Sequence, residues 1–170
     1  IYYYSEADTI FLNPDSSFLF SWLTKLTSID LSGFDSTNVT TMEAMFYYDQ
    51  TITNIDFSGF YAGNVTNMSA FLDNCQKIID IDLRNIKTDK VTDISYMFIS
   101  CYNCTNFNLE GFDTSSVTNM EYTFAKCSGI ENFDLTGLNT SKVTSMNHMF
   151  YDVQSQGYID VRTFDTSSVT

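Results

Sequence analysis

The residues best suited to bind a ligand are aspartates that recur at a fixed interval of 26 residues. They are Asp30, Asp56, Asp82, Asp134 and Asp160, and Asn108 occupies the remaining place in the row. Carboxylates in a row could hold Ca²⁺, which accepts several carboxylate oxygens at flexible geometry. The simpler interpretation is a solvated acidic stripe. It is favoured, because no EF-hand or Gly-Asp-rich calcium motif accompanies the row.

Cysteines form a second row. Cys75, Cys101 and Cys127 share one phase, and Cys104 takes an apolar position. Buried free thiols are favoured, because three cysteines in a column cannot all pair among themselves. A Cys75–Cys101 or Cys101–Cys127 bridge is the alternative, since neighbouring repeats would bring two Cα atoms within disulfide distance. A zinc or redox site at Cys101-x-x-Cys104 would need a second pair.

His148 is the only histidine of the chain. It shares its phase with Tyr96 and Tyr122, at positions expected to face outward. A Ser-His-Asp site would require convergent partners, and the periodicity supplies none. We therefore expect no catalytic residues and no cofactor.

The element that positions these rows is a repeat of 26 residues. The dipeptide Val-Thr returns without insertion or deletion at 39–40, 65–66, 91–92, 117–118, 143–144 and 169–170. A strict period in this range is typical of units that must stack to bury their apolar faces.

Two elements are expected in each repeat. Apolar residues alternate at Ile81 and Leu83, as they do in a short half-buried strand. The spacing becomes three and four at Val117, Met120 and Phe124, which predicts a two-turn helix, and Thr118-x-x-Glu121 resembles a capping box. The predicted fold class is α/β: one solenoid with one short parallel strand and one short helix per repeat.

The predicted domain organisation has two parts. Residues 1–25 keep the phase only partly, with strands expected at 1–4 and 9–12, and are interpreted as an N-terminal cap or a degenerate first repeat. Residues 26–170 form an array of five to six repeats, uncapped at the C-terminus. The sequence begins with Ile1 and stops within a repeat, which indicates a piece of a longer protein.

Composition limits the partners. The net charge is −13 and the pI is about 4.1, which argues against nucleic acid, because polyanion binding needs clustered Lys and Arg. No apolar run is long enough for a membrane helix, so no membrane insertion is expected within this segment.

Two kinds of surface residue remain. The outward strand positions form a polar face that we interpret as a partner-binding surface: Thr27, Thr53, Asn54, Asn106, Glu131, Asn132 and Tyr158. Plain solvation of this face explains it equally well. Five N-x-S/T sequons are possible glycosylation sites, at Asn38, Asn64, Asn67, Asn103 and Asn139, although Asn-Val-Thr also suits a turn.

The repeat resembles the BspA-like leucine-rich repeat of bacterial surface proteins. The stretch from Cys127 to Phe150 follows that family's pattern, with Phe133-Asp134-Leu135, Val143-Thr144 and Met149-Phe150 in the matching places. The resemblance runs from about residue 26 to 170. It implies a secreted or surface-anchored protein without catalytic residues.

These observations predict a non-enzymatic, extracellular or cell-surface repeat protein that mediates adhesion or binds a protein or glycan. The alternative is a structural protein whose units stack head-to-tail, with copies of itself as the partner, into a filament or an extracellular matrix fibre.

Overall fold

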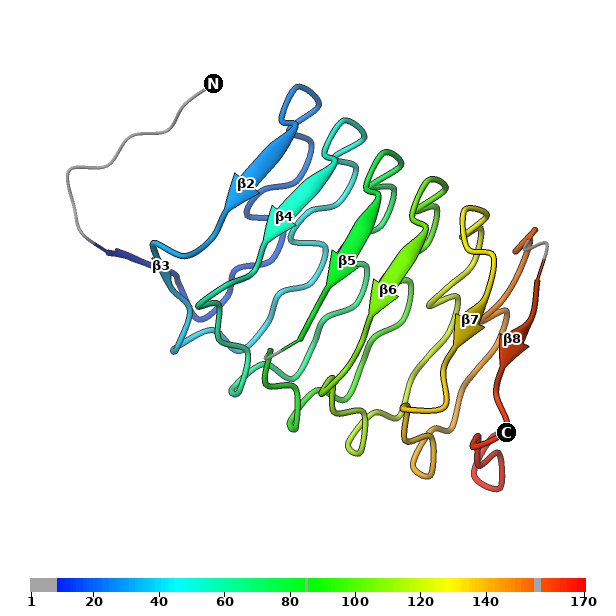
Figure 1. Ribbon diagram of the computed structural model, residues 1–170. Coiled ribbons are helices and arrows are strands. Elements are labelled where there is room, and N and C mark those ends of the chain that lie inside the picture. The colour runs from blue at the N-terminus through cyan, green and yellow to red at the C-terminus, as the bar shows by residue number, and fades with distance from the viewer. Residues whose placement is uncertain (1–8, 85, 155–156) are drawn as a thin grey trace.

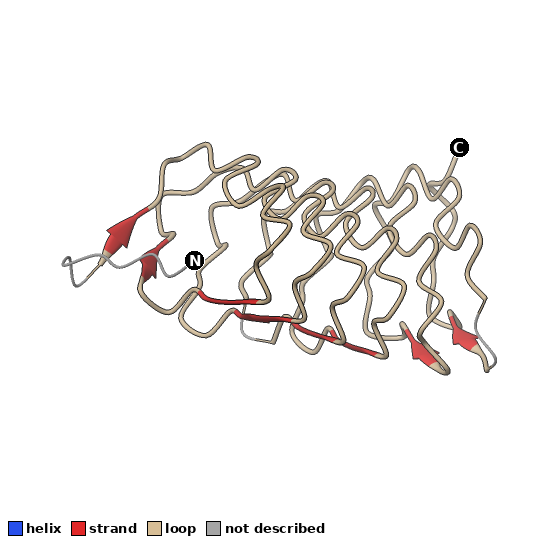
Figure 2. Cartoon of the chain, turned by 90° about the horizontal axis from the view of Figure 1, so that it is seen from above, coloured by secondary structure: helices blue, strands red, loops and turns tan. Residues whose placement is uncertain are grey.

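The chain winds into a stack of coils, each of which takes 26 residues to return to the equivalent place (Figure 1). The computed structural model describes residues 9–84, 86–154 and 157–170. Its strands are β1 (Ile10–Phe11), β2 (Ser28–Asp30), β3 (Phe34–Asp35), β4 (Asn54–Asp56), β5 (Asp80–Asp82), β6 (Asn106–Asn108), β7 (Phe133–Asp134) and β8 (Ile159–Asp160). Figure 2 shows most of these strands along one edge of the stack, with loops and turns elsewhere and no helix in the described chain.

The strands of neighbouring coils lie parallel and in register. Ile29 of β2 is opposite Ile55 of β4, and Phe133 of β7 is opposite Ile159 of β8. β5 pairs with β6 in the same way, and β1 pairs with β3 at the N-terminal end. The short parallel strands predicted for each repeat are therefore present, in small pairs.

A second ladder joins the coils through the residues that follow Val-Thr. Parallel bridges run from Asp15 to Thr41, Asn67, Asp93, Asn119 and Ser145. The threonine of each Val-Thr adds to this ladder. Thr118 donates its backbone N–H to the oxygen of Thr92 at 2.8 Å and its hydroxyl to the same oxygen at 3.2 Å. The first five valines, from Val39 to Val143, are buried beside it. The Val-Thr repeat is thus explained by one inward apolar and one outward hydrogen-bonding residue.

Each segment predicted as a helix is a run of tight turns instead. The N–H groups of residues 42, 44, 46 and 48 donate to carbonyl oxygens of the next coil, at 2.8 to 3.0 Å. Those of residues 45, 47 and 49 donate to the carbonyl three residues earlier. An α-helix would bond each N–H to the residue four positions earlier, within one segment. The α/β fold class with a helix in every repeat, the form of leucine-rich-repeat solenoid that we predicted, is wrong.

Backbone conformation is the physical reason for this difference. Two residues of every turn run have positive φ, between 51° and 66°, although none of them is glycine. They are Phe18 and Trp22, Ala44 and Tyr48, Ala70 and Asn74, Tyr96 and Ser100, Tyr122 and Lys126, and His148 and Asp152. A left-handed residue interrupts a right-handed helix and costs about 1–2 kcal/mol. Hydrogen bonds to the neighbouring coil offset that cost.

The core lies between the strands and the turn runs. Buried side chains from both repeat at equivalent positions and contact their counterparts one coil away. The rings of Phe98 and Phe124 stack at 5.4 Å with an interplanar angle of 18°, and Phe133 of β7 meets Phe124 edge-on at 4.7 Å. Such contacts between coils, rather than within one coil, stabilise the fold.

Residues 9–25 take part in the same ladders. Phe18, Phe20 and Trp22 donate backbone N–H groups to the second coil. The expected strand at residues 1–4 lies outside the described residues. The division of the chain at residue 25 stays a prediction.

Candidate binding surface

The residues that the sequence marks as partner-binding lie on the outer side of the strands, which we call the sheet face. All of them are exposed: Thr27, Thr53, Asn54, Asn106, Glu131, Asn132 and Tyr158. Their neighbours Ile55 and Phe133 point inward and are buried. The two-residue period of a strand explains the exposure of Asn54 and Asn106, which begin β4 and β6, whereas the other five residues lie just before their strands. The structure therefore collects the predicted residues on one polar surface.

The acidic row lies at the ends of these strands, where each carboxylate closes a turn. The Oδ1 atoms of Asp30 and Asp56 each accept the backbone N–H two residues later, both at 2.8 Å. Asp82, Asn108, Asp134 and Asp160 make the same bond. The backbone bond from Ser32 lowers the pKa of Asp30, and the hydroxyl and then the backbone N–H of Thr136 lower that of Asp134, because these bonds favour the charged form. The aspartate at this position thus stabilises the turn that follows the strand.

Two arginines compensate part of the row. Arg84 pairs with Asp82 at 2.6 Å, and Arg162 pairs with Asp160 at 2.7 Å. Among the described residues, no group of three or more His, Cys, Asp or Glu side chains could hold a metal ion. Both the solvated stripe and the calcium ladder stay predictions.

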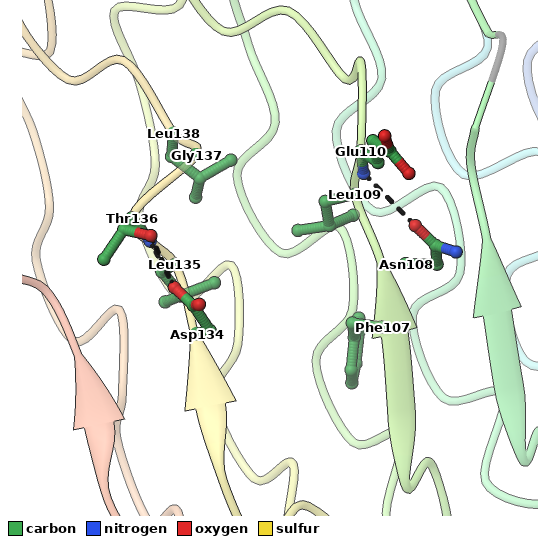
Figure 3. Close-up of a pocket in the computed structure, with 9 residues that line it drawn as sticks. All are labelled: Phe107, Asn108, Leu109, Glu110, Asp134, Leu135, Thr136, Gly137 and Leu138. Atoms are coloured by element: carbon green, nitrogen blue, oxygen red, sulfur yellow. Dashed lines mark hydrogen bonds between the residues drawn. The ribbon is translucent and has the colours of Figure 1, made fainter.

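A hollow of about 250 Å³ opens in the sheet face between β6 and β7 (Figure 3). These two strands belong to different sheets, and the residues that line the hollow come from both strands and from the turns that follow them. Phe107, Leu109 and Leu135 supply apolar surface. Glu110 and Asp134 supply carboxylates. The hollow could receive a small side chain or a sugar ring, with polar atoms at its rim to fix the orientation.

The cysteine row lies in the core. All four thiols are free and buried in the structure. Cys101 donates its thiol to the oxygen of Leu72 at 3.3 Å, and Cys127 donates to that of Phe98 at 3.2 Å. Burial raises the pKa of Cys104 to about 12 and holds that of Cys101 well above its usual value. Protonated, enclosed thiols are poor nucleophiles and poor metal ligands.

The possible glycosylation sites differ in their surroundings. Asn38 and Asn139 are exposed on turns. The side-chain amides of Asn64, Asn67 and Asn103 donate hydrogen bonds to Thr37, Glu43 and Gln76 respectively. Attachment of a glycan to any of these three would require that bond to change. Asn38 and Asn139 are the more accessible acceptors.

Sequence reasoning missed the aromatic residues of the turn runs. His148 was expected at an outer position, and its ring indeed stacks on Tyr122 at 4.7 Å with an interplanar angle of 2°. Trp22 stacks on Tyr48 at 4.2 Å. Three aromatic residues at one phase were visible in the sequence, but only the backbone shows that their rings stack.

Asp49 was also missed. It replaces cysteine in the buried row, and its Oδ1 accepts the backbone N–H of Leu23 at 2.6 Å. The Oδ2 atom is buried and has no hydrogen-bond partner. Burial raises the pKa of Asp49 to about 7. The hydrogen bond from Leu23 favours the charged form and lowers the pKa, but burial has the larger effect.

Comparison with protein families matches the family described as Mycoplasma protein of unknown function, DUF285, over residues 15–127 and 69–170. Together these matches include most of the chain. It belongs to this family. No curated protein and no solved structure matches the chain.

The DUF285 match corrects the resemblance to BspA-like repeats. The matching family is a different one, and the described chain lacks the helix that a leucine-rich repeat of the predicted form would carry. The pattern of apolar residues that suggested BspA-like repeats is explained by the turn runs. No helix of the described residues is long and apolar enough to span a lipid bilayer.

Proposed function

We propose that this protein is a non-enzymatic repeat protein, located outside the cell or at its surface, that mediates adhesion by binding a protein or glycan. The sheet face is the proposed binding surface. One observation carries the proposal: exposed polar side chains repeat along the whole described stack on a backbone that two ladders hold in register. Extended surfaces of this kind suit binding better than reaction chemistry.

The chemistry of the sheet face favours a ligand rich in hydrogen-bond donors. Asn54, Asn106 and Asn132 are exposed in equivalent positions of their coils, and the acidic row runs beside them. Carboxylate oxygens only accept hydrogen bonds, whereas amides both donate and accept. Polypeptides and sugars both offer matching groups. A ligand that repeats along its own length would contact several coils at once and gain avidity.

The hollow between β6 and β7 gives the surface a point of greater specificity. Its apolar lining would cover an inserted group, and Glu110 and Asp134 would bond the polar end of that group. A flat polar surface alone discriminates weakly between ligands, because its contacts remain solvated.

Panels of extracellular matrix proteins and glycans, presented to the immobilised chain, test the proposal. We expect saturable binding to at least one class and attachment of coated beads to cells. If no member of either panel binds and the coated beads do not attach to cells, the proposal is wrong. Light scattering of the same preparation tests the alternative function, a structural protein that assembles from copies of itself. Particle size that grows with protein concentration would favour this alternative.

A further inference from the structure

The turn runs carry a second surface, away from the sheet face. We call it the outer column, and its members are Phe18, Ala44, Ala70, Tyr96, Tyr122 and His148. All six have φ between 51° and 59°, so each side chain leaves the backbone in the same direction, one coil apart. The rings of Tyr96 and Tyr122 stack at 5.0 Å with an interplanar angle of 10°, and His148 continues the stack. From Tyr96 to His148 the column thus carries one stacked ring per coil, whereas Ala44 is buried.

This stack of rings stops at Tyr96. The next position is Ala70, which carries only a methyl group and is partly exposed. Tyr96 is 37% exposed, and the ring that stacks on it among the described residues is that of Tyr122. Ala70 has the same backbone conformation as Tyr96 but carries no ring, and we call this position over Ala70 the vacant place.

A carboxylate belongs to the turn that carries Ala70, and its charge acts on Tyr96. Asp73 belongs to the same turn as Ala70, because its backbone N–H donates to the oxygen of Ala70 at 3.1 Å. Its side chain is partly buried and accepts a hydrogen bond from Asn74 at 2.7 Å. The ion pairs within the described chain are Arg84–Asp82 and Arg162–Asp160, so no cation pairs with Asp73 there.

The electrostatic environment of Tyr96 is negative as well. Burial, and then the charge of Glu121, the neighbouring Tyr122 and the charge of Asp73, raise the pKa of the Tyr96 phenol. An aromatic face next to unpaired negative charge attracts a cation through both the ring quadrupole and the carboxylate.

We propose that the vacant place over Ala70 binds the guanidinium group of an arginine from a partner polypeptide, stacked on Tyr96 and paired with Asp73. Guanidinium is planar and delocalised, so it stacks on an aromatic face as the next ring of the column would, and its N–H donors suit a carboxylate. A lysine ammonium is a compact, strongly hydrated charge that cannot stack. A neutral sugar would leave the charge of Asp73 uncompensated. This inference does not rest on the sheet face.

Titration calorimetry with two synthetic peptides, one alternating glycine and arginine and the other glycine and lysine, tests the proposal. We expect the arginine peptide to bind about fivefold more tightly, since stacking and pairing act together. Ala70→Tyr places a ring in the vacant position and should abolish the difference between the peptides. Ala70→Ser, which leaves the position open, is the matched control and should preserve it.

Asp73→Asn provides a second variant in case Ala70→Tyr fails to fold, as judged by its melting curve. It should weaken binding of the arginine peptide about fivefold, because the ion pair is lost. Equal affinity for both peptides would show only attraction to an acidic protein and would overturn the proposal. So would full binding by folded Ala70→Tyr. Binding of a neutral oligosaccharide such as chitotriose that Ala70→Tyr blocks would reassign the position to a glycan.

Discussion

Thr92 donates both its backbone N–H and its hydroxyl to the backbone oxygen of Thr66, at 2.9 Å and 3.1 Å. The same pair of bonds joins Thr118 to Thr92 and Thr144 to Thr118. A β-branched residue suits the extended backbone at this position, and its hydroxyl adds a second bond between coils. The threonine ladder therefore holds neighbouring coils together on the side away from the strands.

Replacing one hydroxyl of this ladder should weaken the fold modestly. Thr92→Val keeps the branched shape but loses the bond from Oγ1 to Thr66, and we expect a loss of about 0.5–1.5 kcal/mol in the free energy of unfolding. Urea denaturation measures it. Thr92→Ser keeps the hydroxyl and should lose less than Thr92→Val. A valine variant as stable as the parent would show that the hydroxyl bonds contribute nothing.

A glycine substitution distinguishes a turn run from a helix by the sign of its effect. Ala70 has φ of 53°, where glycine is unstrained, so Ala70→Gly should raise stability by about 1 kcal/mol. In a helix the same change would lower stability by about the same amount. Ala125→Gly, at a buried position of a turn run without positive φ, should be destabilising. Thermal melting of both variants gives the comparison.

The sequence predicted the coils and the strands because both depend on periodicity. Ile81 and Leu83 alternate as strand residues do, and the acidic row falls at the strand ends because each carboxylate closes the same turn. Alternation also accounts for the exposure of Asn54 and Asn106 at the start of β4 and β6.

Sequence pattern could not distinguish a helix from the turn runs. Met42, Met45, Phe46 and Asp49 are all buried, at the spacing of three and four that a helix also produces. The two structures differ in the sign of the backbone angle φ at residues such as Tyr48. Tyrosine rarely adopts positive φ, so the residue type does not indicate it. This conformation is held by hydrogen bonds between coils. Because a single repeat cannot form them, the conformational propensities of its residues do not predict them. The stack of rings and the vacant place over Ala70 depend on the same geometry.

Removal of one core ring should be costly. Phe133 is 3% exposed, and its ring meets those of Phe107 and Phe124 at 5.2 Å and 4.7 Å. We expect Phe133→Ala to lower the free energy of unfolding by about 3–5 kcal/mol. Phe133→Leu, which keeps most of the apolar volume, should cost less. A loss below about 1 kcal/mol for the alanine variant would mean that the residue is not packed as described.

The buried carboxyl of Asp49 predicts a pH dependence of stability. Its pKa is about 7 in the folded chain and 3.8 in the unfolded reference, so the folded state favours the protonated form. The resulting stabilisation is complete below about pH 4 and is lost as the pH rises through 7. The melting temperature should therefore fall between pH 5 and pH 8.

Asp49→Asn tests this assignment because asparagine keeps an acceptor for the N–H of Leu23 without a titrating proton. The fall in melting temperature should shrink in this variant. A smaller part should remain, since burial also raises the pKa of Asp73, to about 6. Asp35→Asn changes a half-buried carboxyl whose pKa is lowered by hydrogen bonds from Thr37, and it should keep the full fall. An unchanged pH profile in Asp49→Asn would assign the dependence to other groups.

The proposed function depends most on the sheet face, and attachment of protein-coated beads to cells tests that surface directly. The triple variant Asn54→Arg, Asn106→Arg and Asn132→Arg changes three exposed residues of the sheet face. The control Asn38→Arg, Asn147→Arg and Gln154→Arg makes the same change in charge at exposed positions elsewhere. We predict that the sheet-face variant loses attachment about tenfold while the control stays near the parent. Equal attachment of the two variants would contradict the assignment of binding to the sheet face.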